Sequence, residues 1–172
     1  MATLIFDIET TGEDFDILDE TTQNSLTHWI KKESTNQDEY EAALKDLKEG
    51  LGFSPLTGQI IAIGVLDCEK NRGAVYYQAP SATYTESEEN GIRFRPMAEK
   101  EMLENFWAGA VKYQEFISFN GRAFDVPFLM VRSAIHGIRP SKDLMSNRYL
   151  SSQKFENKHI DLLDQLSFYG AV

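Results

Sequence analysis

The sequence predicts an α/β fold in which helices pack on a β-sheet. Apolar, β-branched segments at 3–9 and 59–67 have the composition of strands, and a short polar turn joins the second to a further strand at 73–78. A stripe of apolar residues at helical spacing follows at about 98–113, and another strand at 115–119 comes directly after it. Strands that alternate with helices along the chain are typical of α/β domains.

The first strand carries the most informative pair of residues, Asp7 and Glu9. Side chains at i and i+2 of a strand share one face, roughly 6.6 Å apart, whereas Leu4, Phe6 and Ile8 occupy the other face. We expect this strand to be apolar on both sides, where two buried like charges are costly unless a cation lies between them. Carboxylate oxygens suit Mg²⁺ or Mn²⁺, so the pair predicts a divalent metal site.

The turn residues Thr10, Thr11 and Gly12 place both carboxylates near the carboxyl end of this strand. Ligands bind at that end of the strands in open α/β sheets, which favours the metal interpretation. The ordinary alternative is an Asp-x-Glu pair on a solvated edge strand that binds nothing.

A helical insertion is expected at about 13–55, between the first two strands. It contains predicted helices near 24–33 and 36–49, and Gly50 or Gly52 would end the second one. The second helix is charged on most of its faces, so we expect a solvated, loosely attached insertion. A role as a lid or as a partner-binding element stays open.

The polar residues 80–96 are expected to form a loop. In the helix at about 98–113, the apolar stripe indicates packing against the sheet rather than a cofactor pocket. After the turn at Asn120-Gly121, a helix is predicted from 125 to 136, and 158–164 is predicted to be a fifth strand or a short turn. Asp125 lies where the helix begins, so a structural capping role is the alternative to a functional one.

Composition places the chain among soluble globular proteins. The 172 residues are expected to form one domain, and the 42% hydrophobic content with 12% aromatic residues excludes general disorder. The single cysteine, Cys68, permits no internal disulfide. The chain has no apolar run of about 18 residues and no signal-like N-terminus, so we expect a cytoplasmic protein without a membrane partner.

The net charge of −10 argues against a uniform attraction to nucleic acid. The charges are unevenly distributed: residues 1–113 hold 10 Lys and Arg against 21 Asp and Glu, whereas residues 114–172 hold 7 against 6. We therefore expect the basic segment between Arg122 and Lys158 to be able to face a polyanion. An ordinary mixed surface is the alternative.

Two motifs resemble a known family. The segment Phe6-Asp-Ile-Glu-Thr-Thr-Gly12 resembles the first motif of the DEDD superfamily of 3′–5′ exonucleases, and Phe119-Asn-Gly-Arg-Ala-Phe-Asp-Val-Pro-Phe-Leu129 resembles the second. The second motif is similar to the form found in the proofreading domains of family B DNA polymerases. Residues 158–170 are similar to the segment that follows it in stand-alone, polymerase-B-like exonucleases.

The resemblance implies a ribonuclease-H-like fold with a mixed five-stranded sheet flanked by helices. It also implies hydrolysis at the 3′ ends of single-stranded DNA or RNA by a mechanism with two divalent cations, Mg²⁺ or Mn²⁺. By resemblance, the catalytic residues and metal ligands would be Asp7, Glu9 and Asp125. Thr10, Thr11, Asn120 and Phe124 would contact the substrate, with Phe124 as a stacking surface for a base.

The superfamily pattern also contains a fourth carboxylate in a later helix, four or five residues after a Tyr or His. Tyr169 has no such partner, and the C-terminal helices of the pattern are not recognisable, so a fragment or an unidentified protein partner is expected. His159 and Asp164 match the spacing formally. We expect low or no turnover from this chain because a metal ligand is lacking, and activity from a full-length parent.

Two other function classes stay open. One is a non-catalytic module that binds nucleic-acid ends or a protein on a decayed nuclease fold. The other is an aspartyl-phosphate phosphotransferase, but that chemistry normally uses a second Asp at the position of Glu9. Metal-independent binding would indicate the first class, and a covalent phosphate on Asp7 would indicate the second.

Overall fold

A computed structural model describes residues 2–79, 81 and 84–171. The chain forms two compact units: Met1–Glu9 together with Ile60–Val172, and Thr10–Gln59. The first contains most of the sheet and the helices that pack on it, and the second contains a helical hairpin. Each unit is described by itself below.

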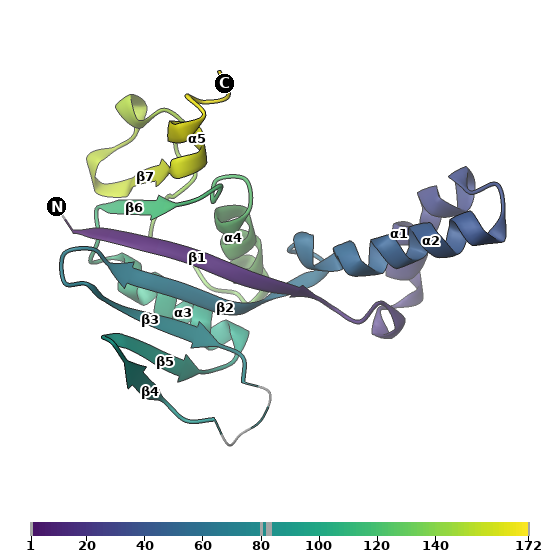
Figure 1. Ribbon diagram of the computed structural model, residues 1–172, viewed down its shortest axis with the longest axis horizontal. Coiled ribbons are helices and arrows are strands. Elements are labelled where there is room, and N and C mark those ends of the chain that lie inside the picture. Colours follow the sequence, from purple (N-terminus) through teal and green to yellow (C-terminus); the bar gives the residue numbers. More distant parts are fainter. Residues whose placement is uncertain (1, 80, 82–83, 172) are drawn as a thin grey trace. The chain divides into compact units, whose positions relative to one another are not determined.

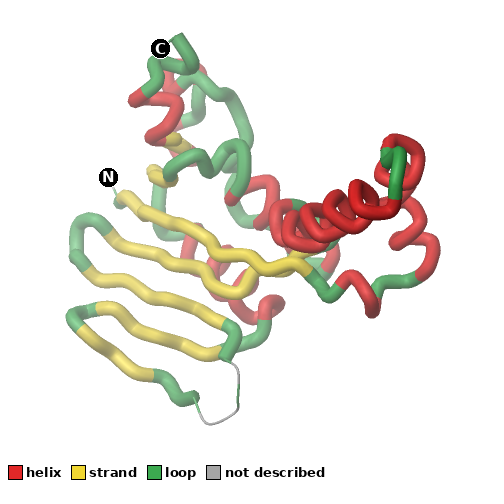
Figure 2. The backbone as a smooth tube through the Cα atoms, turned by 45° about the vertical axis from the view of Figure 1, so that its right-hand side comes forward, coloured by secondary structure: helices red, strands yellow, loops and turns green. Residues whose placement is uncertain are grey.

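The sheet has the strand order β4-β5-β3-β2-β1-β6-β7 within the described residues. The strands are β1 (Thr3–Gly12), β2 (Gly58–Asp67), β3 (Arg72–Tyr77), β4 (Ser87–Glu89), β5 (Ile92–Pro96), β6 (Glu115–Ser118) and β7 (Lys158–Asp161). The β2–β3 and β4–β5 pairs are antiparallel, whereas β3–β5, β1–β6 and β6–β7 are parallel (Figure 1; Figure 2). The mixed sheet with flanking helices confirms the predicted α/β class.

The hydrophobic core of this unit lies between the sheet and two helices, α3 (Glu99–Ala110) and α4 (Asp125–Ile135), which pack on the same face of the sheet (Figure 1). β1 contributes Leu4, Phe6 and Ile8 to this core. A short helix, α5 (Leu162–Leu166), follows β7 directly.

The second unit is built on an antiparallel pair of helices, α1 (Glu20–Glu33) and α2 (Gln37–Gly50). The side chains of Asp19 and Asn36 accept hydrogen bonds from backbone N–H groups in the first turn of each helix, which explains where the helices begin. α2 has no buried residue, in agreement with its charged sequence.

Close backbone contacts join the two ends of this hairpin. Short 3₁₀ helices at Phe15–Ile17 and Leu51–Phe53 flank the hairpin. A Cβ atom on Gly12 would lie 2.8 Å from the Cβ atom of Leu51, so only glycine fits at that position.

The expected loop at 80–96 is wrong for its second half, because residues 87–96 form the β4–β5 hairpin. The turn is Asn90-Gly91, and both residues have positive φ, 52° and 81°, as hairpin turns of this kind require. This hairpin raises the strand number from the expected five to seven. Within the described residues, no helix has the length and apolar character that crossing a bilayer requires.

Candidate functional site

Asp7 and Glu9 share one face of β1, as the strand periodicity predicted, but that face is exposed rather than buried. Leu4, Phe6 and Ile8 alternate with them and are buried under α3 and α4. The expectation of a strand buried on both faces is therefore wrong, because these two helices cover only one side. Neither carboxylate forms an ion pair within the part of the chain that the structure describes.

Asp125 lies beside β1, although 117 positions separate it from Ile8 in the sequence. β6 is the parallel neighbour of β1 and pairs with it only as far as Ile5, opposite Ile117. Farther along β1, the Asp125 carboxylate takes the place of a strand partner: its Oδ1 accepts a hydrogen bond of 3.0 Å from the Ile8 backbone N–H. This bond connects the first residue of α4 to the residue between Asp7 and Glu9.

The surroundings of Asp125 disfavour its ionised form. The side chain is only 3% exposed, and burial together with the negative charge of Asp7 raises the pKa of Asp125 to about 6. Phe124, not Asp125, occupies the capping position of α4. The carboxylate therefore does not serve as the N-cap, which was the structural alternative for this residue.

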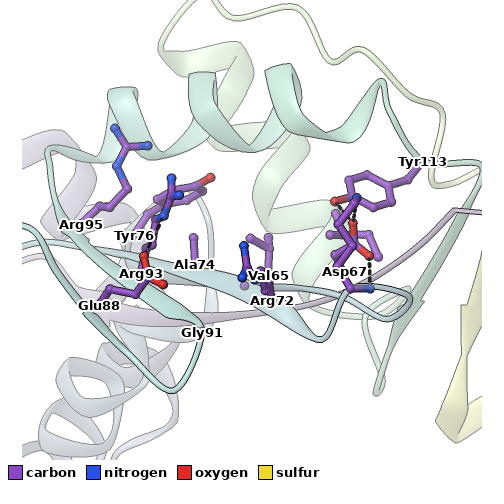
Figure 3. A pocket seen from close by; sticks show the side chains of 13 residues that line it. Val65, Asp67, Arg72, Ala74, Tyr76, Glu88, Gly91, Arg93, Arg95 and Tyr113 are labelled. Atoms are coloured by element: carbon purple, nitrogen blue, oxygen red, sulfur yellow. Dashed lines mark hydrogen bonds and ion pairs between the residues drawn. The ribbon is translucent and has the colours of Figure 1, made fainter.

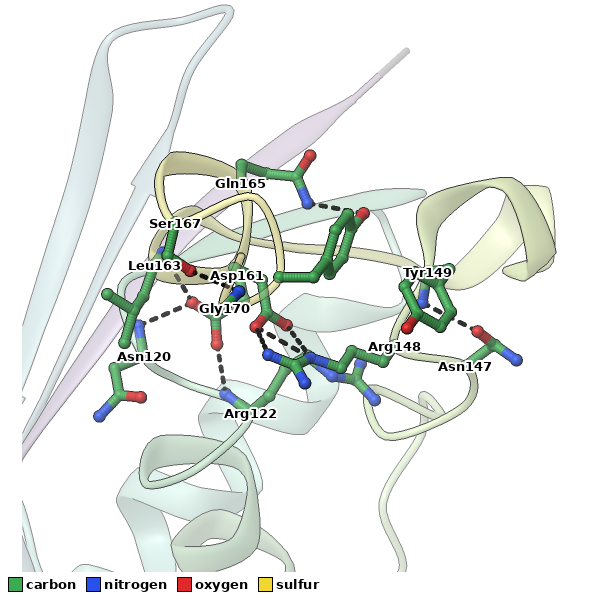
Figure 4. Close-up of polar contacts among 12 residues, drawn as sticks. Asn120, Arg122, Asn147, Arg148, Tyr149, Asp161, Leu163, Gln165, Ser167 and Gly170 are labelled. Atoms are coloured by element: carbon green, nitrogen blue, oxygen red, sulfur yellow. Dashed lines mark hydrogen bonds and ion pairs between the residues drawn. The ribbon is translucent and has the colours of Figure 1, made fainter. Parts of the chain in front are cut away.

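Asp161 holds the loop that leads into α4, a role that sequence reasoning missed. Its Oδ1 accepts hydrogen bonds from the backbone N–H groups of Asn120 (2.8 Å) and Leu163 (3.0 Å), and its Oδ2 accepts one from Arg122 (2.9 Å; Figure 4). Asn120 has a φ of 58°, a left-handed conformation that asparagine tolerates. β7 thus fixes the turn that sets the position of Asp125. The available signal in the sequence was an aspartate at the end of the last predicted strand.

The next residue of that loop, Gly121, has no room for a side chain. A Cβ atom at this position would lie 2.1 Å from the Ser118 Oγ atom. The Asn-Gly pair of the motif is therefore explained by backbone conformation and space.

His159 and Asp164, which match the His-x-x-x-x-Asp spacing, both have structural partners. His159 is buried, and its Nδ1–H donates to the Leu144 carbonyl oxygen at 3.0 Å. Its Nε2 therefore accepts the 2.7 Å hydrogen bond from the Ser118 hydroxyl. Burial lowers the pKa of His159, in agreement with a neutral ring. Asp164 forms an ion pair with Arg148 (Figure 4).

The four residues expected to contact substrate have different surroundings. Asn120 is exposed, and Phe124 is half-buried with its ring centroid 5.4 Å from that of Phe128. Thr10 and Thr11 belong to the helical unit, where the Thr10 hydroxyl donates to the Gly52 carbonyl oxygen at 2.8 Å.

The basic segment 122–158 does not form one free surface. Arg132 is buried, and its guanidinium binds both carboxylate oxygens of Glu99 on α3, at 2.8 and 2.7 Å. Arg122 donates to the Leu144 carbonyl oxygen. The charge count overestimated what this segment offers to a polyanion, because part of its charge holds the fold together.

The donor chemistry of Asp7, Glu9 and Asp125 suits a hard divalent cation, since all three supply carboxylate oxygens and none has a cationic partner in the part of the chain that the structure describes. The arrangement is looser than a finished metal centre. Among the described residues, no group of three or more His, Cys, Asp or Glu side chains is placed to hold a metal ion. Asp125 thus lies beside the strand that carries Asp7 and Glu9, but the three carboxylates do not surround one point.

One known protein family matches most of the chain. The family described as "Predicted 3′-5′ exonuclease related to the exonuclease domain of PolB" matches residues 57–172. That range contains Asp125 and the second motif, whereas Asp7 and Glu9 precede it. No curated protein sequence matches the chain.

Among solved structures, the family B DNA polymerase from the hyperthermophilic archaeon Pyrobaculum calidifontis is similar, with a TM-score of 0.50 and 13% sequence identity. The match covers 96% of this chain and 16% of the polymerase chain. At this identity the likeness shows the fold, which is the ribonuclease-H-like fold that the motifs predicted. Because the family match spans more than half of the residues, the chain belongs to the family of predicted 3′–5′ exonucleases related to the exonuclease domain of PolB.

Proposed function

We propose that this protein is a divalent-metal-dependent 3′–5′ exonuclease that removes nucleotides from single-stranded nucleic-acid ends. Membership of the PolB-related family supports the reaction class. The chemistry of the Asp7, Glu9 and Asp125 side chains supports the metal dependence, since no cation of the protein offsets their charge in the described residues.

One observation carries the proposal: the hydrogen bond from the Ile8 N–H to Asp125 Oδ1. It brings the second motif to the strand that carries the first motif. The carboxylate of Asp125 has no cationic side-chain partner among the described residues. A buried carboxyl with a raised pKa beside two exposed carboxylates is an arrangement typical of functional sites rather than of stabilising ion pairs.

Asp7, Glu9 and Asp125 would hold the divalent cations, Mg²⁺ or Mn²⁺. When bound, such cations neutralise phosphodiester charge and lower the pKa of water. The protein's own contribution is positional: β1 fixes the separation of Asp7 and Glu9, and Asp161 fixes the loop before Asp125. Asn120 and Phe124 are the proposed contacts to the incoming strand.

The test is nucleotide release from single-stranded DNA and RNA oligonucleotides in Mn²⁺, with the label at either end. We expect stepwise shortening from the 3′ end, and a loss of about 100-fold or more in Asp7→Asn and in Asp125→Asn. Asp46→Asn is the matched control, because Asp46 is an exposed aspartate of α2 without a partner. Equal activity in all variants, or no release by the folded wild-type chain, would contradict the proposal.

A non-catalytic module that binds nucleic-acid ends is the second candidate. The absence of a three-ligand metal group in the described residues favours it. It predicts oligonucleotide binding of equal strength in EDTA and in Mn²⁺, with no shortening in either. Stepwise 3′ shortening in Mn²⁺ that Asp7→Asn abolishes would reject this candidate and leave the nuclease.

A further inference from the structure

A hollow with charged and apolar lining residues lies on the opposite face of the sheet from Asp7 and Glu9. It has a volume of about 260 Å³ and lies over β3 and β5 (Figure 3). Leu4, on the buried face of β1, lines it, as does Tyr113 just after α3. The hollow is therefore separate from the candidate nuclease site.

Three arginines project into this hollow because of strand register. Arg72 begins β3, and residues two positions apart on a strand share a face. Arg93 and Arg95 of β5 lie opposite Ala74 and Tyr76 of β3, respectively, so all three guanidinium groups are on one side of the sheet. Figure 3 shows Arg72 in the middle of the hollow and the other two at one end.

The positive charge of these arginines is only weakly compensated. Arg72 is exposed and has no hydrogen bond or ion pair within the described residues. Arg93 meets Glu88 through Nε at 3.2 Å, with side-chain exposures of 62% and 54%. Arg95 meets Glu86 through Nε at 3.4 Å, and it also donates to the Asn105 amide oxygen at 3.2 Å and lies over the Tyr76 ring. The ion pairs with Glu88 and Glu86 are solvent-exposed, so they are weak and can be exchanged for a stronger anion.

The acid at the other end of the hollow is already neutralised. Asp67 accepts hydrogen bonds from the Lys70 ammonium at 2.6 Å and from the Tyr113 hydroxyl at 3.0 Å. These bonds hold the pKa of Asp67 at about 2. Asp67 therefore does not compete for the arginines, and the hollow keeps an excess of positive charge in a chain of net charge −10.

The floor of the hollow is made of small residues. Ala74 lies between Arg72 and Tyr76 on the same face of β3, and Gly73 also lines the space. The Tyr76 hydroxyl has no hydrogen-bond partner among the described residues. A short side chain flanked by guanidinium groups and a free hydroxyl leaves room for a compact, oxygen-rich anion.

We propose that this hollow binds the phosphate group of a nucleotide or of a nucleic-acid strand. Guanidinium groups form paired hydrogen bonds to phosphate oxygens, and Arg72 has all of its donors available. The 260 Å³ volume fits a phosphate with its neighbouring sugar rather than a larger organic ligand. Because the chain repels anions overall, binding depends on these residues and not on general charge.

The test is binding to the full chain in EDTA, so that it does not depend on nuclease activity. Inorganic phosphate, a nucleoside 5′-monophosphate and a short single-stranded oligonucleotide are titrated and followed by NMR chemical shifts and fluorescence anisotropy. We expect Arg72→Gln to weaken binding about tenfold and to reduce the salt dependence by about one phosphate contact. Arg139→Gln is the control, because Arg139 is exposed and unpartnered outside the hollow.

A second variant tests the space rather than the charge. Ala74→Leu fills the hollow, keeps all three arginines and should abolish binding, while circular dichroism and the unfolding midpoint report whether the fold is kept. Binding of phosphate and mononucleotide would identify a free nucleotide as the ligand, and binding of the oligonucleotide alone would identify a strand. Equal losses in Arg72→Gln and Arg139→Gln, or unchanged binding in a folded Ala74→Leu variant, would overturn the proposal.

Discussion

Glu99 and Asp125 are two carboxylates of the same unit with similar burial, 6% and 3% exposed, and opposite electrostatic surroundings. Burial alone would raise the pKa of Glu99, but hydrogen bonds from Arg132 and His136 outweigh burial and lower it. Asp125 receives one hydrogen bond from another residue, at the Ile8 N–H, and faces the like charge of Asp7. Glu99 is paired with a cation, whereas no cationic side chain of the described residues pairs with Asp125.

This difference separates a structural carboxylate, Glu99, from the carboxylate that we propose to be functional, Asp125. Glu99 joins α3 to α4 through Arg132, and it also accepts a hydrogen bond of 2.7 Å from the Ile60 N–H of β2. Every contact of Glu99 favours the folded state. Asp125 is held in place by β1 at an energetic cost, as expected where a ligand supplies the missing charge.

The largest effect is expected from breaking the paired carboxylate. Arg132→Met keeps most of the apolar stem but leaves Glu99 buried without its main cation, which should cost about 3–5 kcal/mol of unfolding free energy. Urea denaturation measures this loss of unfolding free energy, and Arg139→Met, at an exposed arginine, is the control. A loss no greater than that of the control would show that the Glu99 pair does not hold α3 and α4 together.

The second effect has the opposite sign. In the metal-free protein, ionisation of Asp125 is disfavoured by the shift of its pKa from 3.8 to about 6. Asp125→Asn should therefore raise the unfolding free energy by about 3 kcal/mol at pH 8, at roughly 1.4 kcal/mol per pKa unit. The Asn side chain can still accept the hydrogen bond from Ile8.

The pH dependence sharpens this prediction. A raised folded pKa gives a contribution that is present at low pH and is lost as pH rises through about 6, so the stabilising effect of Asp125→Asn should vanish near pH 4. The lowered pKa of Glu99 works in the other direction, because its contribution is lost as pH falls. Adding Mn²⁺ should stabilise the wild type and not the variant. A destabilised Asp125→Asn variant at pH 8 would contradict the comparison.

Much of this organisation was predictable from local sequence. The alternation of Leu4, Phe6 and Ile8 with Asp7 and Glu9 gave the correct face for each side chain in β1. The Asn90-Gly91 pair indicates a hairpin turn, and Ile92 and Phe94 alternate with arginines after it as in a strand. The polar composition of 80–96 led instead to the prediction of a loop. Local patterns therefore predict elements and faces well.

Long-range contacts were not predictable in the same way. The exposure of Asp7 depends on which face the helices cover, and the bond between Asp125 and Ile8 depends on where β6 stops pairing with β1. Arg132 looked like part of a basic surface, but its place on the inner face of α4 buries it against Glu99. Such contacts follow from sheet order and helix packing, which no single segment encodes.

A smaller loss of stability is expected from the loop that positions Asp125. Asp161→Asn can keep the two hydrogen bonds to Oδ1. In the wild type the backbone N–H of Arg122 donates to Oδ2, and the amide nitrogen that replaces Oδ2 in the variant cannot accept this hydrogen bond. One unsatisfied N–H should cost about 1–2 kcal/mol in urea denaturation. Asp143→Asn is a suitable control, because within the described residues this exposed loop aspartate accepts only a local hydrogen bond, from the Met145 N–H.

The nuclease assay gives Asp161→Asn a second readout. If the loop sets the place of Asp125, nucleotide release should fall more than the loss of stability explains, at temperatures where the variant stays folded. Unchanged release in the variant would mean that Asp161 stabilises β7 and α5 without positioning the site.

The smallest effect concerns the charge coupling between the two motifs. Asp7→Asn removes the like charge and should lower the pKa of Asp125 from about 6, but burial, the larger cause, should keep it above 3.8. Carboxyl ¹³C chemical shifts followed through a pH titration of the metal-free protein measure the change, and Asp46→Asn should leave it unaltered. If the pKa of Asp125 were the same in Asp7→Asn as in the wild type, the two carboxylates would be too far apart to share a cation. The first and second motifs would then lie on one strand edge without forming one site.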